Sequence, residues 1–211
     1  MKPEYIKYLK GTTTIGVVCS DGIVIGGDMR ATAGNIIANS ETRKVFKIDN
    51  NLGMTIAGGV GDAQEIIRII KAQNELYKMN EGRPLSPKSA ASLLSIIFQQ
   101  NKMVPYFSWN IIGGLDGEDP QLYSLDYMGG VTEESRFTSV GSGSESALGY
   151  IEDAYKKGLT TKEAVKMVAK ALGIAMRRDS ASGDGIIVAA ITKSGYSEYT
   201  SKDLEKMTAG K

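Results

Sequence analysis

The chain has 211 residues, of which 42% are hydrophobic and 23% charged, and its 25 basic and 24 acidic side chains leave a formal net charge of +1. This balance excludes the strongly basic surface of a protein that binds nucleic acid or an anionic membrane. The chain has no histidine and a single cysteine, which excludes Ser-His-Asp and Cys-His nucleophilic sites, intrachain disulfides and Cys-rich zinc sites.

The first sixty residues predict strands. Four apolar, β-branched runs are expected to be strands, at residues 12–20, 23–28, 44–49 and 52–59. The Asp21-Gly22 pair between the first two runs is a strong signal for a β-hairpin. Residues 29–43, which lie between the second and third runs, are predicted to form a loop.

The rest of the chain alternates pairs of helices with pairs of strands. We expect helices at 61–79 and 88–102, strands at 107–116 and 120–127, helices at 144–157 and 162–178, and strands at 183–192 and 195–200. Ser86 followed by Pro87 predicts the start of the second helix. Gly158 ends the third helix, and Thr160 with Glu163 predicts a capping box for the fourth.

This order of elements predicts an α+β fold. Runs of strands followed by runs of helices favour mainly antiparallel sheets with the helices in separate layers. Two sheets stacked face to face, with helix pairs outside, would bury all of these segments in a four-layer αββα sandwich. We expect one domain over residues 12–211. Residues 1–11 carry three lysines and a glutamate, unlike a secretory signal, and no segment resembles a membrane helix, so a cytoplasmic protein is expected.

Three segments are rich in residues that could carry chemistry. The glycine-rich stretch 57–64 precedes a helix, where exposed N–H groups could bind an oxyanion. It matches neither a P-loop nor GxGxxG, which disfavours nucleotide binding. The segments 141–146 and 177–185 gather serine and aspartate, which is most often a sign of helix caps and loops. Three sulfur-containing side chains are expected to pack in the core: Cys19, Met103 and Met128.

Gly11 is followed by three consecutive threonines. The ordinary interpretation is that β-branched threonine suits the start of a strand. A more specific interpretation is that one of the threonines is a nucleophile. A hydroxyl nucleophile needs a base beside it, and because the chain has no histidine, another group must be that base. If the Gly11–Thr12 bond were cut, Thr12 would gain an amine with a reference pKa of about 7.7–8.0, able to accept the proton of its own hydroxyl. Asp28 and Lys44, at the ends of predicted strands, are the candidate carboxylate and lysine.

These motifs together resemble a known family, the β subunits of the archaeal-type 20S proteasome, which are N-terminal nucleophile (Ntn) hydrolases. The resemblance runs from Gly11 to about Tyr199 and rests on GTTTIG, DGIVIGGDMRAT, RKVFKI, AGGVGDA, GSGS and RDSASGDG, in the family's order. It implies the Ntn-hydrolase fold and a threonine-type endopeptidase that is made as a zymogen. Autocatalytic cleavage of the Gly11–Thr12 bond would remove residues 1–11 as a propeptide.

The resemblance also implies a role for each matching residue. Thr12 would be the nucleophile, Asp28 and Lys44 its charged pair, and Gly58 the donor of the oxyanion-hole N–H. The residues around the threonine amine would be Ser142, Asp179 and Ser182. Arg30 would be a structural support. The substrate pocket would include Ala31, Ile56 and Val60, whose small or apolar side chains favour cleavage after hydrophobic residues.

By the same resemblance, seven copies would form a β ring, stacked on a second β ring and on rings of α subunits. Unfolded polypeptides, delivered by an ATP-dependent unfoldase ring, would be the substrates. No cofactor, metal, nucleic acid or membrane is implied.

Other interpretations remain open beside this one. The chain could be a catalytically silent subunit of the ring, although such chains typically lose the nucleophile, the lysine or the glycine before the cleavage site. It could be another Ntn amidohydrolase, but such an enzyme would not share the sequence context of Asp28 and Lys44. A nucleotide-binding module would rest on the glycine-rich segments alone.

Overall fold

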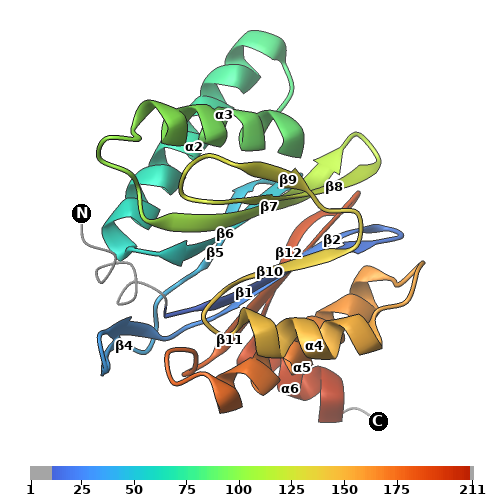
Figure 1. Ribbon diagram of the computed structural model, residues 1–211. Helices are drawn as coiled ribbons and strands as arrows, with labels where there is room; N and C mark the ends of the chain where they lie inside the picture. Colours follow the sequence, from blue (N-terminus) through green and yellow to red (C-terminus); the bar gives the residue numbers. More distant parts are fainter. Residues whose placement is uncertain (1–10, 210–211) are drawn as a thin grey trace.

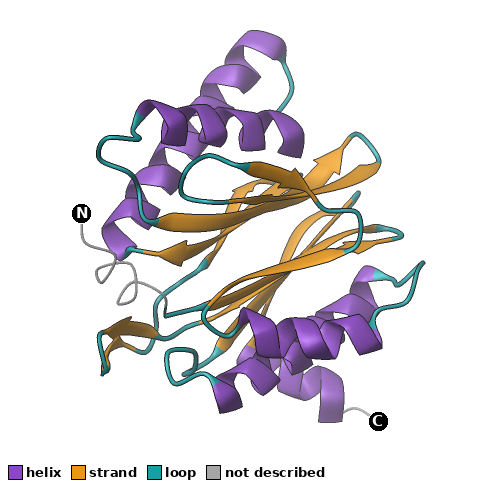
Figure 2. Ribbon diagram, in the orientation of Figure 1, coloured by secondary structure: helices purple, strands orange, loops and turns teal. Residues whose placement is uncertain are grey.

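The computed structural model describes residues 11–209, so of the predicted propeptide only Gly11 lies within the described part. The described chain forms four layers, with two stacked sheets between two layers of helices (Figures 1 and 2). The first sheet has the order β10 (Phe137–Gly141), β1 (Thr13–Cys19), β2 (Gly22–Asp28), β11 (Ile186–Thr192) and β12 (Gly195–Thr200). The second has the order β5 (Val45–Asp49), β6 (Leu52–Gly58), β7 (Ser108–Asp116), β8 (Asp119–Leu125) and β9 (Val131–Glu133).

All neighbouring strands in both sheets are antiparallel. The second sheet is covered by α2 (Val60–Glu81) and α3 (Pro87–Gln100), and the first by α4 (Ser144–Ala154), α5 (Thr161–Arg178) and α6 (Ser201–Ala209) (Figure 1). The predicted α+β sandwich of two antiparallel sheets flanked by helices is therefore confirmed.

Three apolar clusters hold the layers together. Ile23, Ile25 and Ile111 belong to the cluster between the two sheets. The two others lie between each sheet and its helices. Because both faces of each sheet are covered, β1 and β2 are almost entirely buried. A strand buried on both faces reads as a nearly continuous apolar run, which is why these strands were recognisable in the sequence.

Two of the three local signals for helix ends are confirmed, and the third, Gly158, is not the end of its helix. The Ser86 side chain accepts a hydrogen bond from the Ser89 N–H, 3.1 Å away, at the start of α3. Thr160 and Glu163 form the predicted capping box of α5. Helix α4, however, ends at Ala154 and not at residue 157, because Tyr155 is already extended and its ring packs edge-on against Phe137.

Five elements were not predicted from the sequence. The expected loop at 29–43 contains a small hairpin of β3 (Ala31–Ala33) and β4 (Ile36–Asn39), and β9, β10 and α6 were not expected at all. These segments are short or largely exposed, so they lack the apolar periodicity that predicts an element.

Strand β11 begins at Ile186 rather than at 183, because residues 183–185 belong to a loop whose carbonyls accept from the Met29 N–H and whose Gly183 N–H donates to Asp28 at the end of β2. Cys19 is buried as expected, but Met103 and Met128 are 92% and 43% exposed, so their assignment to the core was wrong. Among the described helices, none combines the length and apolar character needed to cross a membrane.

Candidate active site

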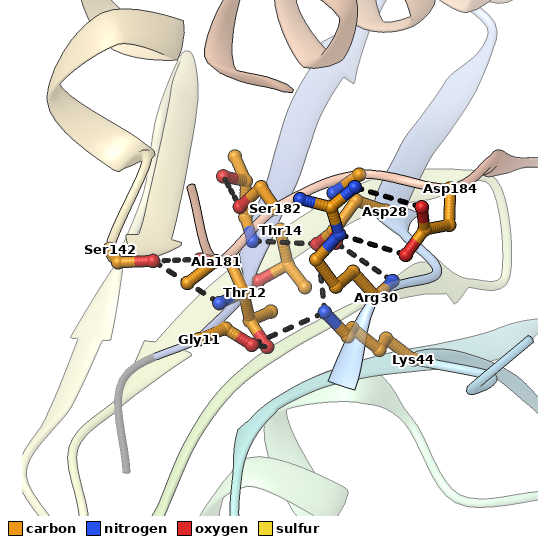
Figure 3. Close-up of polar contacts among 12 residues, drawn as sticks. Gly11, Thr12, Thr14, Asp28, Arg30, Lys44, Ser142, Ala181, Ser182 and Asp184 are labelled. Carbon is orange, nitrogen blue, oxygen red and sulfur yellow. Dashed lines mark hydrogen bonds and ion pairs between the residues drawn. The ribbon is translucent and has the colours of Figure 1, made fainter. Parts of the chain in front are cut away.

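The predicted site residues gather at one end of the sandwich, where the start of β1 approaches β6 of the other sheet. Thr12 immediately precedes β1 and is only 2% exposed. The Thr12 hydroxyl donates a hydrogen bond to the Gly11 carbonyl oxygen. The Thr12 N–H donates to Ser142 Oγ, 3.2 Å away (Figure 3). The Thr12 hydroxyl therefore lies beside the carbonyl group of the bond expected to be cut.

Asp28 and Lys44 form a buried ion pair next to this bond. Lys44 Nζ is 2.9 Å from Asp28 Oδ1, and the two side chains are 6% and 0% exposed. The same Nζ lies 3.3 Å from the Gly11 carbonyl oxygen. Burial lowers the pKa of the Lys44 ammonium from its ordinary value, because the attraction of the Asp28 carboxylate offsets only part of the desolvation.

The Asp28 carboxylate accepts three backbone hydrogen bonds besides that of the lysine. Oδ1 accepts from the Thr13 N–H at 2.8 Å, and Oδ2 accepts from Arg30 N at 3.1 Å and Gly183 N at 3.0 Å. The last residue of β2 therefore connects the start of β1 with the loop before β11. Hydrogen bonds of this kind stabilise a carboxylate in its charged form.

Ser142, Asp179 and Ser182 meet on the other side of Thr12. Asp179 Oδ2 accepts hydrogen bonds from Ser142 Oγ at 2.5 Å and from Ser182 Oγ at 2.6 Å. Asp179 is the residue that ends α5, and Ser142 directly follows β10. Both serines thus contact Asp179, and Ser142 reaches the threonine nitrogen directly.

Arg30 supports the loop that carries Ser182. Its guanidinium forms two hydrogen bonds of 2.8 Å with the Asp184 carboxylate (Figure 3). A third, also of 2.8 Å, goes to the Ser180 carbonyl. Through these bonds the Arg30 guanidinium holds the pKa of the Asp184 carboxyl below its usual value, and Asp184 raises the pKa of Arg30. Asp184 has a φ of 67°, and among residues 11–209 it is the only non-glycine residue with a positive φ. The sequence placed Asp184 in the serine- and aspartate-rich segment 177–185 but indicated no separate role for it.

Gly58, at the end of β6, has a φ of 153°. A Cβ atom at this position would lie 2.0 Å from the Phe107 carbonyl oxygen, so a side chain cannot be accommodated. Gly58 and Thr12 line two hollows together. The larger one, of about 410 Å³, is also lined by the three predicted pocket residues, Ala31, Ile56 and Val60. The smaller one, of about 240 Å³, includes Trp109 and Val140.

Within residues 11–209, no group of three or more Cys, Asp or Glu side chains is arranged to hold a metal ion. The polar contacts that exist around Thr12 are those of hydroxyls, one lysine and two carboxylates. Such groups can supply a nucleophile, a cation beside a carbonyl oxygen, and oriented acceptors for an amine.

Comparison with known proteins identifies the family of the chain. The family model "Proteasome subunit" matches residues 8–191. The chain is 48% identical over 201 residues to a protein of Methanosphaerula palustris named "Proteasome subunit beta", covering 95% of both chains. It is 46% identical to the protein of the same name from Methanococcus aeolicus, covering 97% of this chain and 95% of the relative. It is 45% identical to "Proteasome subunit beta 1" of Thermococcus onnurineus, covering 94% and 97%. The chain therefore belongs to the proteasome subunit family and is of its archaeal β type, as the motifs in the sequence predicted.

Proposed function

We propose that this chain is a catalytic β subunit of the proteasome core, a threonine endopeptidase that cuts its own Gly11–Thr12 bond to expose Thr12 as the nucleophile. One observation carries the proposal. The Thr12 hydroxyl and the Lys44 ammonium both contact the Gly11 carbonyl oxygen, and Lys44 is buried against Asp28. A nucleophile and a cation at the same carbonyl group are what an acyl transfer requires.

In the self-cleavage, Thr12 Oγ attacks the Gly11 carbonyl carbon, and the proton that the hydroxyl loses is passed to the Thr12 nitrogen, the leaving group. Lys44 stabilises the negative charge that develops on the carbonyl oxygen, since it already lies 3.3 Å from it. The C–N bond then breaks, and Gly11 remains attached as an ester of the Thr12 hydroxyl. Water hydrolyses this ester, which releases the propeptide with a Gly11 carboxylate and leaves a free amine and hydroxyl on Thr12.

In the processed protein the same groups would cut a peptide substrate. The Thr12 amine accepts the proton of the Thr12 hydroxyl, which attacks the substrate carbonyl carbon. Lys44 favours the alkoxide electrostatically, and the Gly58 N–H donates to the oxyanion. Protonation of the departing amine and hydrolysis of the acyl-enzyme complete the turnover. Ser142, Asp179 and Ser182 orient the Thr12 amine throughout.

The larger hollow supplies the substrate pocket of this proposal. Gly11, which precedes the bond to be cut, lines this hollow and not the smaller one. The residue on the acyl side of a substrate would therefore enter the same space. Ala31, Ile56 and Val60 offer it small and apolar side chains, which favours cleavage after hydrophobic residues.

A catalytically silent ring subunit is the second candidate. It is disfavoured because Thr12, Asp28 and Lys44 are all present and the last two are paired. A buried ion pair costs desolvation and adds little net stability, so a subunit with a purely structural role has no need of this one.

The proposal extends to the assembly. As a member of the proteasome subunit family, the chain assembles with other subunits into the proteasome core. We propose a heptameric β ring stacked on a second β ring and on α-subunit rings, in the cytoplasm, with an ATP-dependent unfoldase ring delivering unfolded polypeptides. Electron microscopy of the co-expressed particle would count the subunits of each ring, and cell fractionation would test the location.

The catalytic proposal is tested by co-expression with an α-type subunit, followed by intact-mass measurement and assay of a fluorogenic hydrophobic peptide. The wild-type chain should lose eleven residues and turn over the peptide. Thr12→Ala should keep those residues and show no turnover, whereas Thr12→Ser, which keeps a hydroxyl, should still process itself. Full activity with residues 1–11 retained, or turnover by Thr12→Ala, would overturn the proposal.

A further inference from the structure

We propose that Thr13 is a positioning residue for the proton chemistry of Thr12. Its hydroxyl ends a chain of hydrogen bonds that leads through Ser182, Asp179 and Ser142 to the Thr12 nitrogen. The family resemblance assigns no role to Thr13. The inference rests on the proposed function of Thr12 as an N-terminal nucleophile.

The contact that carries this inference is buried and short. Thr13 and Ser182 are both 0% exposed, and their hydroxyl oxygens lie 2.7 Å apart. They are 169 positions apart in the sequence. Thr13 also donates its backbone N–H to Asp28, 2.8 Å away, so the residue contacts both polar clusters that flank Thr12.

Counting protons sets the direction of the chain. A hydroxyl has one proton to donate, and an ionised carboxylate only accepts. Ser182 donates its proton to Asp179 Oδ2 at 2.6 Å, so in its contact with Thr13 the Ser182 oxygen must accept and Thr13 must donate. Ser142 likewise donates to Asp179 Oδ2, at 2.5 Å, and therefore accepts from the Thr12 N–H. Two arms thus end on one carboxylate oxygen, one from Thr12 and one from Thr13.

The surrounding backbone leaves room for this hydroxyl. A Cβ atom on Gly143 would lie 2.2 Å from Thr13 Oγ1. Gly143 precedes α4 and has an ordinary negative φ of −92°, so its backbone conformation does not require glycine. The same Cβ would lie 3.2 Å from Asp179 Oδ2 and 3.2 Å from Ala175 Cβ, so glycine at position 143 leaves room for the Thr13 hydroxyl and for the carboxylate at the centre of the hydrogen-bond chain.

Thr14 shows that this arrangement is specific to the middle threonine. Side chains alternate between the faces of a strand, and Thr14 accordingly points away from Ser182. The Thr14 hydroxyl makes one long contact of 3.4 Å with the Val140 carbonyl and is as buried as that of Thr13. Thr14 is therefore a matched control, with the same side chain and the same burial but no connection to the chain of hydrogen bonds.

Removing the Thr13 hydroxyl should raise the pKa of the Thr12 amine. Hydrogen bonds in a chain strengthen one another, so without Thr13 the Ser182 hydroxyl donates less strongly to Asp179. The Asp179 carboxylate then attracts the Ser142 proton more strongly, which makes the Ser142 oxygen a better acceptor for the Thr12 ammonium. A group that is better bonded in its charged form has its pKa moved to favour that form. Less of the amine is then free to act as a base at neutral pH.

The test measures kcat and KM against pH for the co-assembled, processed protein. Thr13→Val should shift the acid limb of the kcat profile to higher pH and lower kcat at pH 7 by about two- to tenfold, the effect of one net hydrogen bond. KM should stay unchanged, because Thr13 lines neither of the two hollows beside Thr12. Thr13→Ser should restore the wild-type profile, and Thr14→Val should keep it.

Two further outcomes keep the test decisive. Gly143→Ala, which keeps Thr13 but displaces its hydroxyl, should reproduce the shift of the acid limb even if Thr13→Val fails to assemble. A wild-type profile in Thr13→Val or Gly143→Ala, or a shifted profile in Thr13→Ser, would overturn the inference while leaving the proposed function intact. A wild-type protein without Thr12-dependent turnover would instead overturn the proposed function, and this inference with it.

Discussion

The buried pair of Asp28 and Lys44 allows a quantitative prediction, because the two partners depend on each other unequally. The Asp28 carboxylate accepts from four donors, two on each oxygen: Thr13 N and Lys44 Nζ on Oδ1, and Arg30 N and Gly183 N on Oδ2. Lys44 Nζ contacts only the Asp28 carboxylate and the Gly11 carbonyl in the described part of the chain. Asp28 is therefore the centre of the network, and Lys44 is one of its branches.

The substitution Asp28→Asn replaces one carboxylate oxygen by an NH₂ group. Whichever way the amide is oriented, two of the four donors lose their acceptor and face another donor. A buried donor left unsatisfied costs about 1–3 kcal/mol, so the free energy of unfolding should fall by about 2–6 kcal/mol. That is a large fraction of the total of about 5–15 kcal/mol for a typical protein.

Lys44→Met should lower the free energy of unfolding less than Asp28→Asn does, and its main effect should be on self-cleavage. Breaking a buried ion pair usually costs about 3–5 kcal/mol because a charge is left alone, but here three backbone N–H groups still hold the Asp28 carboxylate. We therefore expect Lys44→Met to lower the free energy of unfolding by an amount at or below the lower end of that range. Self-cleavage should stop, since no cation then lies at the Gly11 carbonyl oxygen.

Both variants can be followed by urea unfolding, with the fluorescence of the single tryptophan, Trp109, as the signal, and by intact mass after assembly. Lys71→Met, at an exposed position of α2, is the control and should behave as the wild type in both assays. If Lys44→Met lost more stability than Asp28→Asn, the lysine and not the backbone would be what holds Asp28. If Lys44→Met processed itself at the wild-type rate, the proposed role of the cation would be wrong.

Three further predictions follow from the geometry. The pKa of Lys44 is lowered, so on raising the pH its positive charge is lost before the ordinary lysine pKa of about 10.4 is reached. The kcat/KM of the processed enzyme should therefore fall on an alkaline limb that lies below that value. A profile that stays flat to about pH 10.4 would contradict an electrostatic role for the ammonium. In Gly58→Ala the new Cβ would lie 2.0 Å from the Phe107 carbonyl oxygen, so the backbone must shift and its N–H is displaced from the oxyanion. We expect kcat to fall by about 100- to 1,000-fold, as for the loss of one oxyanion donor. In the control Gly61→Ala the new Cβ has no atom within 4 Å, and peptide turnover should be unchanged. Burial raises the pKa of Cys19 to about 12, so the folded protein should resist thiol-alkylating reagents at pH 8 until urea exposes the residue, and rapid labelling of the native protein would refute its place in the core.

What the sequence alone determined was the part of the structure that depends on neighbours along the chain. The Asp21-Gly22 turn and the capping box of Thr160 and Glu163 are contacts over a few residues, so their residue types were enough to predict them. The strands buried on both faces were equally recognisable. The motifs around Thr12, Asp28 and Lys44 identified the family, because each keeps the family's residue types at the family's spacing.

Only the tertiary structure decided how the distant parts meet. Strand β10 is half-buried and lacks a clear alternation, and it exists because β1 offers it a partner at Thr13 to Val17. That pairing brings Ser142 to the Thr12 nitrogen. The distinction between Thr13 and Thr14 was also invisible in the sequence, since both positions carry the same side chain and neither follows the expected cleavage site. The partner of Thr13, Ser182, lies in the loop before β11. Because β2 pairs with both β1 and β11, it brings these two residues together although they are 169 positions apart in the sequence.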